Sequence, residues 1–276
     1  MINAEEITML RPESLFDLEG HKLKGLFDKA EYAWEGLKNL PGYIRNNIKP
    51  NVTEIRRGKS LIDQDIIISN GKVIRSGFII DTARNIVEID GEVIKNATII
   101  YAGVSLMDDE ICIGQGTVIE PGAMIKGPTI IGDNTEIRQG AYIRGNVLVG
   151  DKCVVGHTTE MKSAVMLGGS KAGHFAYIGD SILGRVNLGA GTKLANLKII
   201  ESKVILTIEG KKYATGLRKF GAILADGVET GCNSVTTPGT ILSKNTLLYP
   251  NGTARGYYPP NSLIKLKQNQ EIEKRR

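Results

Sequence analysis

Aliphatic residues recur at every sixth position through the middle of the chain. Nine of them follow one another without a slip: Ile113, Ile119, Ile125, Ile131, Ile137, Ile143, Val149, Val155 and Met161. Four residues after each of the first eight stands a small or β-branched residue, from Thr117 to Thr159. The next residue of the series, Met166, follows after five residues instead of six, and the six-residue spacing continues from there. The same spacing is found again near Leu188 and Leu224. A period of six fits neither an amphipathic helix nor an alternating strand. It is typical of a parallel β-helix.

In such a β-helix each hexad forms one short strand and one turn, and three hexads close a triangular coil of 18 residues. The aliphatic residue is expected inside the coil, and the small residue points inward near a corner. Neighbouring coils stack at the spacing of β-strands, about 4.8 Å. We therefore predict a mainly β fold in which residues 98–258 form a β-helix of hexapeptide repeats. The open ends of the stack need covering.

Residues 1–97 are predicted to form a helical and short-strand region. Apolar residues at spacings of three and four predict an amphipathic helix from about Lys22 to Leu40. Pro41 ends this helix or starts a second short turn through Ile48. The helix is a candidate cap for the β-helix, or a contact with another protomer.

Short segments rich in β-branched residues and separated by Asn-Gly or Asp-Gly turns predict four strands, at 65–68, 72–74, 78–80 and 86–89. Residues 197–221 interrupt the six-residue period and are basic and partly β-like. We interpret them as a loop or hairpin extruded from the repeats, a kind of insertion that often carries function. Residues 259–276 are predicted to be a basic C-terminal tail.

The composition is that of a soluble globular protein. The chain has 276 residues, of which 41% are hydrophobic and 24% charged, and this excludes global disorder. No apolar run approaches the length of a membrane span, so we expect no membrane partner. The first ten residues place no basic segment before an apolar stretch, so no signal peptide is expected.

The cysteines and the net charge indicate the cellular compartment and the class of ligand. Cys112, Cys153 and Cys232 are scattered and odd in number, which argues against a disulfide framework and favours a cytoplasmic protein. The net charge of +5 is too small to indicate nucleic-acid binding, and it mildly favours anionic small molecules.

Three cations share one place on successive coils. Lys126, Arg144 and Lys162 are spaced 18 residues apart, and each directly follows an inward aliphatic residue. Their side chains should form a column about 5 Å apart. Like charges so close are costly unless an anion meets them. The column is therefore either a phosphate site or a solvated edge whose side chains splay apart.

Two histidines also share a position. His157 and His174 lie one coil apart once the five-residue step is allowed for. A stacked pair is compatible with a metal site, but the remaining histidine, His21, lies in the predicted helical region. The alternatives are a single catalytic base with a polar neighbour and an ordinary pair of surface histidines.

A longer motif adds a resemblance to a known family. The stretch from Val155 to Asn196 holds the blocks E-M-K, G-S-K-A-G-H-x-x-Y-x-G-D and V-N-x-G-A-G-T. It resembles the acetyltransferase domain of the bifunctional N-acetylglucosamine-1-phosphate uridylyltransferase/glucosamine-1-phosphate acetyltransferase. The later block T-G-L-R-K-F-G-A-I-L-A-D-G-V-E-T-G-C-N is similar to archaeal sugar-1-phosphate nucleotidylyltransferase/acetyltransferases. The resemblance covers roughly residues 98–257 and implies a left-handed coil.

The resemblance also implies roles for individual residues. The catalytic base of the family falls on His174. The acceptor contacts fall on Arg144 and Lys162 for the phosphate, on Tyr177 and Asn187 for the sugar phosphate, and on Asn196 near the reacting amine. The backbone at Gly189 and Ala190 matches the segment that lines the acyl-CoA groove. Further CoA contacts are expected near Gly231 and Cys232, and in 250–255, where the cation is Arg255.

Three departures from the family bear on this reading. No Gly-rich G-x-G-T-R-type loop lies near the N-terminus, and about 100 residues cannot hold a nucleotidylyltransferase domain, so we expect that activity to be absent. One residue is missing between Asp180 and Asn187, which changes the expected geometry of Asn187. Asn196 is followed by Leu-Lys-Ile instead of the bacterial Tyr-Asp-Gly, which bears on the identity of the sugar.

The sequence thus predicts an acyl-CoA-dependent N-acetyltransferase that acts on an amino-sugar phosphate such as glucosamine-1-phosphate or galactosamine-1-phosphate. Acetyl-CoA would be the co-substrate, no metal would be needed for the transfer, and the resemblance implies a homotrimer. The alternative is a non-catalytic hexapeptide-repeat protein that binds a sugar phosphate or serves as scaffold for a separate nucleotidylyltransferase. A weaker alternative keeps the enzyme but changes the donor to a longer acyl-CoA, or the acceptor to a nucleotide-linked amino sugar.

Overall fold

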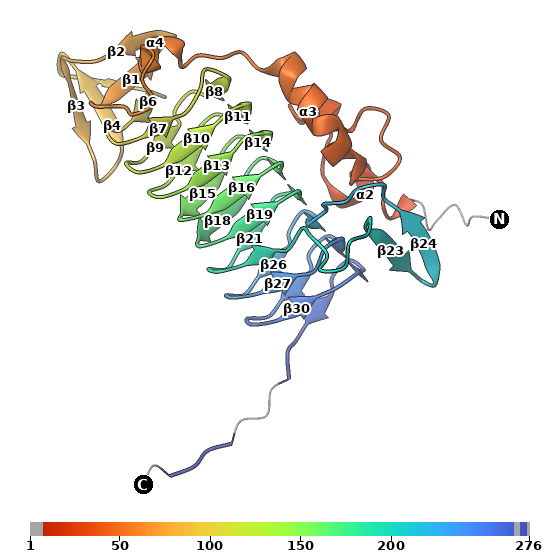
Figure 1. Ribbon diagram of the computed structural model, residues 1–276. Coiled ribbons are helices and arrows are strands. Elements are labelled where there is room, and N and C mark those ends of the chain that lie inside the picture. The colour runs from red at the N-terminus through yellow and green to blue at the C-terminus, as the bar shows by residue number, and fades with distance from the viewer. Residues whose placement is uncertain (1–7, 268–270, 275–276) are drawn as a thin grey trace.

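The computed structural model describes residues 8–267 and 271–274, and the parts of the predicted tail at 268–270 and 275–276 lie outside this range. The chain builds a β-solenoid of about nine turns, as the six-residue period predicts. Figure 1 shows the coils stacked along one axis, with an N-terminal arm lying along one side. Each coil contributes one strand to each of three parallel sheets, which we call the first, second and third faces in chain order.

The strands of the three faces are short and evenly spaced. Those of the first face are β6 Thr98–Ile100, β9 Val118–Ile119, β12 Glu136–Ile137, β15 Val154–His157, β18 Lys171–His174, β21 Asn187–Leu188, β26 Glu229–Thr230, β29 Leu247–Leu248 and β32 Leu263–Ile264. Those of the second face are β7 Ser105–Leu106, β10 Met124–Lys126, β13 Tyr142–Arg144, β16 Glu160–Lys162, β19 Tyr177–Gly179, β22 Lys193–Leu194, β27 Val235–Thr236 and β30 Thr253–Ala254. Those of the third face are β8 Ile111–Ile113, β11 Thr129–Ile131, β14 Val147–Val149, β17 Val165–Met166, β20 Ile182–Leu183, β25 Ala222–Leu224, β28 Thr240–Leu242 and β31 Tyr257–Tyr258.

The interior is filled as the sequence pattern predicts. Aliphatic residues such as Ile125 and Ile143 pair in register and are fully buried. The small residue four places later is also buried, and the hydroxyls of Thr117 and Thr135 are satisfied by carbonyl oxygens of the next coil. Thr117 Oγ1 donates to Gly132 O at 2.7 Å, and Thr135 Oγ1 donates to Gly150 O at 2.9 Å. These bonds offset the cost of burying a polar group.

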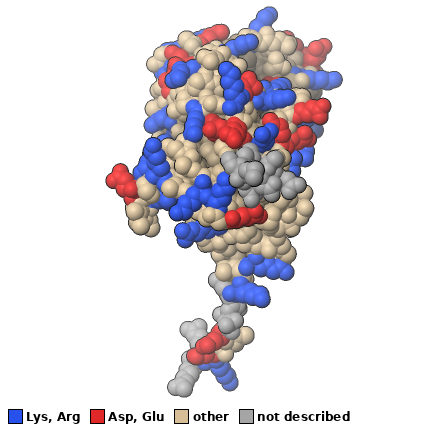
Figure 2. All heavy atoms as spheres, turned by 90° about the vertical axis from the view of Figure 1, so that its right-hand side faces the viewer, with Lys and Arg blue, Asp and Glu red and all other residues tan. Residues whose placement is uncertain are grey.

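The N-terminal arm covers the third face. Its helices are α2 Pro12–Leu15, the 3-10 helix η1 Lys24–Phe27, α3 Glu35–Asn47 and α4 Thr53–Arg56. Strands of the third face are therefore buried on both sides, as in β14 and β25. Gly36 lets α3 approach closely, because a Cβ there would stand 2.8 Å from Phe27 and 2.9 Å from Ile182. Figure 2 shows the side of the molecule that bears the arm, where Lys and Arg side chains mix with acidic ones.

The predicted helix at Lys22–Leu40 is wrong in its bounds. The helix begins at Glu35, because Lys29 adopts a positive φ of 63° after η1 and breaks the regular path. Pro41 does not end the helix but lies inside α3. The stripe of Gly36, Leu40 and Ile44 is buried against the solenoid on both sides of Pro41, and this burial keeps the helix continuous although Pro41 has no N–H to donate.

A hairpin, and not the helix, covers the first end of the solenoid. Strands β1 Ile66–Ser69 and β2 Lys72–Ile74 pair antiparallel, and β1 pairs antiparallel with β6. Strands β3 Phe78–Asp81, β4 Ile86–Ile89 and β5 Glu92–Ile94 form a separate antiparallel sheet beside it. At the other end, Leu248 and Ile264 pair in register, so β32 extends the solenoid into the predicted tail.

The insertion, which the sequence predicts to be a loop or a hairpin, forms a hairpin. Strands β23 Ile205–Ile208 and β24 Lys211–Ala214 pair antiparallel and project from the solenoid (Figure 1). Its base is joined by a bridge between Leu197 and Lys219. No helix of the described residues is long and apolar enough to cross a membrane.

Close stacking at the corners should make one glycine indispensable. A Cβ on Gly156 would fall on the carbonyl oxygen of Gly173 in the next coil, whereas a Cβ on Gly173 would meet no atom within 4 Å. We expect Gly156→Ala to destabilise the fold by about 3 kcal/mol, because backbone atoms must shift to relieve the overlap. We expect Gly173→Ala to change stability by about 0.5 kcal/mol at most. Urea unfolding followed by circular dichroism measures both, and equal midpoints for the two variants would contradict the tight stacking.

Candidate functional site

The predicted cation column exists on the second face, but its charges have partners. Lys126 pairs in register with Arg144, and Lys162 follows on the next coil. Both of the first two cations contact the ring of Tyr142, whose centroid is 5.5 Å from Lys126 Nζ and 5.7 Å from Arg144 Cζ. Arg144 Nη1 donates to Glu160 Oε1 at 2.6 Å. These contacts lower the cost of stacking like charges.

Lys162 has a second lysine beside it. The neighbouring ammonium of Lys219 is the main reason why the pKa of Lys162 lies below its usual value, and partial burial is the second. Asp180 lies close enough to both lysines to interact with their charges, while burial raises the pKa of its carboxyl. Sequence reasoning did not single out Lys219. The signal was present, because Lys219 lies in the block that is similar to the archaeal enzymes.

Tyr177 and Asn196 complete this polar group. Asn196 Nδ2 donates to Asp180 Oδ2 at 2.5 Å. A Cβ on Gly179 would stand 2.5 Å from Tyr177 Oη and 2.7 Å from Asn196 Nδ2, so both side chains cross over this glycine. Gly179 pairs in register with Lys162. The structure therefore brings together four of the predicted residues, Arg144, Lys162, Tyr177 and Asn196, and adds Glu160, Asp180 and Lys219.

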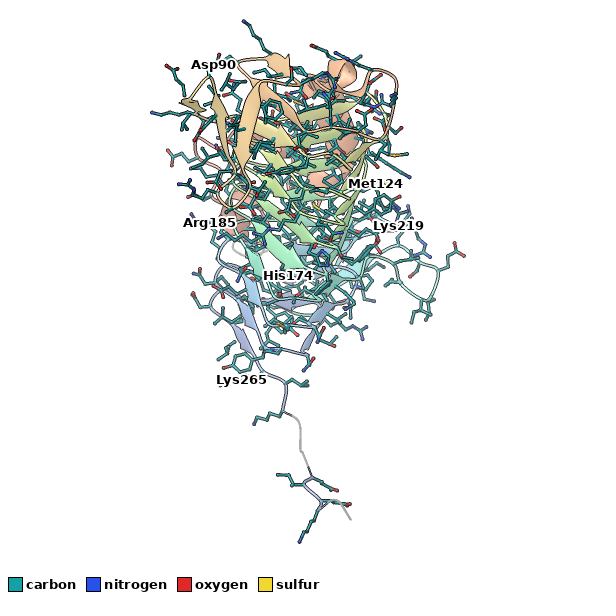
Figure 3. All side chains as sticks on the ribbon, turned by 90° about the vertical axis from the view of Figure 1, so that its left-hand side faces the viewer. Asp90, Met124, His174, Arg185, Lys219 and Lys265 are labelled. Carbon is teal, nitrogen blue, oxygen red and sulfur yellow. The ribbon has the colours of Figure 1, made fainter. Side chains whose placement is uncertain are left out.

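His174 stands at the corner where the first face turns into the second. It ends β18, and Tyr177 begins β19 three residues later. His174 is exposed, and its neighbour Phe175 is 52% exposed with a positive φ of 54°. In Figure 3, His174 lies near the middle of the view, with Met124 and Lys219 toward one side and Arg185 on the other.

The two histidines pair in register as predicted, but their rings differ in environment. His157 Nδ1 lies 3.0 Å from Gln139 O, and its Nε2 lies 3.2 Å from Thr158 Oγ1. Both ring nitrogens of His157 are thus engaged within the fold. The exposed His174 is the member of the pair that is placed to meet a ligand. Within residues 8–267 and 271–274, no three His, Cys, Asp or Glu side chains come together in a group that suits a metal ion.

The glycine-rich segments lie at the same corner as His174. Gly191 N donates to His174 O at 3.0 Å, and Asn233 N donates to Ala190 O at 2.8 Å. These bonds place Ala190 one coil beyond His174, and Cys232 one coil beyond Ala190. A Cβ on Gly189 would stand 2.5 Å from the carbonyl carbon of Gly231, so this corner admits only small residues.

Two predicted residues lie away from this group. Asn187 is on the first face, where it pairs with Lys171 and Glu229. Arg255 follows Ala254 on the second face, four coils beyond Lys162, which is about 19 Å along the axis. Asn187 therefore does not join the polar group of Arg144, Lys162, Tyr177 and Asn196 within one chain, and Arg255 lies far from that group along the second face.

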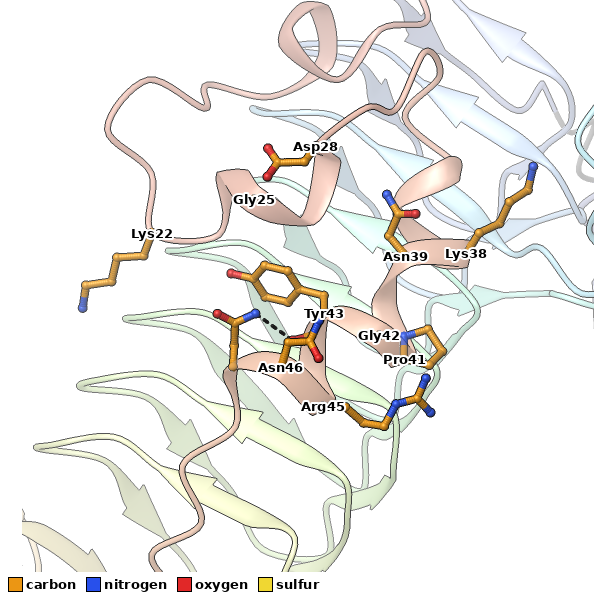
Figure 4. A pocket seen from close by; sticks show the side chains of 11 residues that line it. Lys22, Gly25, Asp28, Lys38, Asn39, Pro41, Gly42, Tyr43, Arg45 and Asn46 are labelled. Carbon is orange, nitrogen blue, oxygen red and sulfur yellow. Dashed lines mark hydrogen bonds between the residues drawn. The ribbon is translucent and has the colours of Figure 1, made fainter.

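A cavity of about 750 Å³ lies in the arm, and none of the predicted site residues lines it. Figure 4 shows it between η1 and α3, where Lys22, Lys38 and Arg45 point in different directions. Lys22 instead bridges two carboxylates, Asp133 at 3.0 Å and Asp151 at 2.6 Å. This cavity belongs to the packing of the arm.

Comparison with known proteins confirms the expected resemblance over part of the chain. Residues 125–247 match the family of the GMPPB C-terminal domain. A bifunctional sugar-1-phosphate nucleotidylyltransferase/acetyltransferase of Sulfurisphaera tokodaii is 39% identical over 97 residues, which are 35% of this chain and 24% of that protein. The bifunctional protein GlmU of Methanococcus maripaludis is 34% identical over 122 residues, which are 44% of this chain and 29% of that protein.

The match spans about a quarter of the length of these relatives. Among solved structures, perosamine N-acetyltransferase from Caulobacter crescentus in complex with CoA and GDP-perosamine is 17% identical. The alignment covers 58% of this chain and 53% of that one, with a TM-score of 0.27. A likeness this low carries no argument about the present site.

The lysine pair allows a direct test of the site's electrostatics. Lys219→Met keeps the length of the side chain but removes its charge. We expect the pKa of Lys162 to rise toward its usual 10.5, because no neighbouring ammonium then opposes its protonation. NMR titration of methyl-labelled lysines measures it. Lys212→Met removes the same charge from an exposed position of β24 and should leave the pKa unchanged. An unchanged pKa in Lys219→Met would show that the two ammonium groups do not interact.

Proposed function

We propose that this chain is an acyl-CoA-dependent N-acetyltransferase that acetylates the amine of an amino-sugar phosphate, of the glucosamine-1-phosphate or galactosamine-1-phosphate type. One observation carries the proposal. A group of cations on the second face, an exposed imidazole at the corner and a small-residue corner follow one another along one edge of the solenoid. The similarity to a bifunctional sugar-1-phosphate nucleotidylyltransferase/acetyltransferase supports the same reaction.

The cations of the second face suit the phosphate of the acceptor. Arg144 offers a planar fork of donors, and Lys162 with Lys219 offers two ammonium groups. A phosphate dianion would relieve the repulsion between these lysines, which is the reason to add Lys219 to the predicted pair. Arg144 would exchange Glu160 for the phosphate, at small cost because solvent reaches and screens this ion pair, whose side chains are 41% and 34% exposed. Tyr177 and Asn196 are then left to contact the sugar beside the amine.

The chemistry needs a proton acceptor next to the amine. An amino sugar attacks only as the free amine, so its ammonium form gives one proton to solvent before attack. The amine nitrogen then forms the C–N bond to the thioester carbonyl, and the imidazole of His174 takes a second N–H proton from this nitrogen as general base. This step gives a tetrahedral intermediate. When it collapses, the C–S bond breaks and the departing CoA sulfur receives a proton from the imidazolium.

The corner beyond His174 suits the acyl donor. Gly189 N and Gly191 N already donate to carbonyl oxygens, those of Thr230 and His174. Among the described backbone groups of this turn, the Ala190 N–H is therefore the donor left for the oxyanion. Small residues at Gly231 and Cys232 leave the continuing edge open for the pantetheine arm. Arg255, about 19 Å from Lys162, suits a phosphate at the far end of CoA.

We also propose a homotrimer. His174 and Phe175 stand open to solvent in a single chain, and a neighbouring copy across this corner would enclose the reacting groups. Asn187, which faces away from the acceptor residues of its own chain, is free to contribute to a site formed with that copy.

The sharpest test of the enzyme compares the two stacked histidines. We expect His174→Ala to lower kcat by about 10²–10⁴, because the general base is lost. His157→Ala, one coil away, should retain turnover. Thiol release from acetyl-CoA is measured with glucosamine-1-phosphate and with galactosamine-1-phosphate, and light scattering checks that each variant is a trimer.

Either of two results would contradict the assignment. Equal turnover in the His174→Ala variant would exclude His174 as the base. A folded protein that binds a sugar phosphate but releases no thiol with either sugar would support the binding or scaffold alternative.

The reactivity of the cysteine thiols can report where the donor binds. Burial raises the pKa of Cys153 to about 11, while Cys232 is exposed at the proposed CoA edge. We expect the Cys232 thiol to react first with a thiol reagent and acetyl-CoA to slow this reaction, because the donor covers it. Cys232→Ser should remove the fast phase. Unchanged reactivity of Cys232 in saturating acetyl-CoA would place the donor elsewhere.

A further inference from the structure

We propose that Trp34 of the N-terminal arm is a positioning residue for the acceptor site. It holds the returning end of the insertion against the solenoid, and so holds Lys219 and Asn196 in place. The inference rests on the proposed function for what the site binds. The placement of the two side chains can be tested separately.

Trp34 joins the arm to the insertion through a cluster of aromatic rings. Its side chain is 2% exposed and lies at the start of α3. The ring stacks on Tyr32, with centroids 4.6 Å apart and planes within 3° of parallel. It meets Tyr213 of β24 edge-on at 6.4 Å and Phe220 at 6.4 Å. The arm and the returning side of the hairpin therefore share one buried contact.

Phe220 carries this contact directly into the site. It is fully buried and follows Lys219 in the chain. Phe220 N donates to Asn196 O at 2.9 Å, and Gly221 N donates to Asp180 O at 2.8 Å. Lys219, Asn196 and Asp180 are thus fixed by the backbone at the residue on which Trp34 packs.

The solenoid also contacts this segment, because Gly239 N donates to Phe220 O at 2.9 Å and a Cβ on Gly239 would stand 2.8 Å from Leu206 of β23. Leu183 pairs in register with Leu224, so the insertion makes one coil far longer than its neighbours. The loop that leads into the hairpin is exposed, at Ile199 fully and at Ile200 to 79%, whereas Leu206 and Ile208 of β23 are buried. The arm adds support to the returning strand through the side chains of Tyr213 and Phe220.

The charges of the site give this support a role. The ammonium groups of Lys162 and Lys219 repel each other, so an unrestrained insertion would relax with Lys219 moved away. Packing of Phe220 under Trp34 opposes that relaxation. The arm is therefore coupled to the phosphate-binding group although none of its residues belongs to that group.

The experiment compares substitutions that remove the contact between Trp34 and Phe220 with one that leaves it intact. Trp34→Leu and Phe220→Leu cut the contact from its two sides, and Trp34→Phe preserves an aromatic ring. Phe16→Leu is the matched control, because Phe16 is also a buried arm residue but stacks on Phe27, at 5.5 Å. Amide hydrogen exchange of the segment 215–221 reports the placement, and steady-state kinetics report its effect on the acceptor.

We expect faster exchange at Phe220 and Gly221 in Trp34→Leu and Phe220→Leu, and wild-type exchange there in Phe16→Leu. In the same two variants KM for the sugar phosphate should rise about tenfold, while kcat and KM for acetyl-CoA stay near wild type. Trp34→Phe should keep both the exchange rate and KM for the sugar phosphate close to wild type, because it preserves an aromatic ring. Adding Lys219→Met to Trp34→Leu should raise KM little further, because both changes remove the same contact.

Three results would overturn the proposal. One is unchanged exchange at 215–221 in Trp34→Leu. Another is faster exchange with an unchanged KM for the sugar phosphate. The third is a loss that Phe16→Leu reproduces equally, which would show a merely structural role. If the unmodified protein neither binds nor turns over a sugar phosphate, the proposed function fails, and the exchange data still decide whether Trp34 holds Lys219 in place.

Discussion

Close stacking of successive coils is the constraint on which this structure depends. Each coil repeats the path of the one before at about 4.8 Å, and this is possible only where corners carry glycine and inward positions carry aliphatic or small hydroxyl residues. Gly156 and Gly189 show how little space is left. Because of the same constraint, residues at equivalent positions of successive coils lie in a column. A functional side chain on one coil therefore lies next to the side chain at the same position of the next coil.

The arm decides which surfaces remain for function. By burying the outside of the third face, it leaves the first and second faces and the corner between them open. His174 stands at that corner, with the cations on one side and the glycine-rich turns beyond it. Through Trp34 and Phe220 the arm also supports the insertion that delivers Lys219. A segment with no side chain in the site thereby contributes to its geometry.

The charges of this polar group are only partly balanced within the chain, because three cations, Arg144, Lys162 and Lys219, meet two carboxylates. Arg144 pairs with Glu160, and Asp180 interacts with the charges of both lysines. In the proposed function such a group would exchange a carboxylate for the phosphate of the substrate. Balance of this kind favours reversible binding of a small anionic substrate, because the gain from the new contacts is reduced by those that are given up.

The sequence by itself determined the parallel β-helix, the inward residues, the stacking of Arg144 on Lys126 and the pairing of His157 with His174. All of these follow from a local period that one coil imposes on the next. The tertiary structure alone decided that α3 runs through Pro41 along the third face, that Asn187 lies apart from the acceptor residues, and that Lys219 joins Lys162. The arm and the insertion have no repeat to set their register. Their positions come from burial against distant residues, which spacing along the chain does not encode.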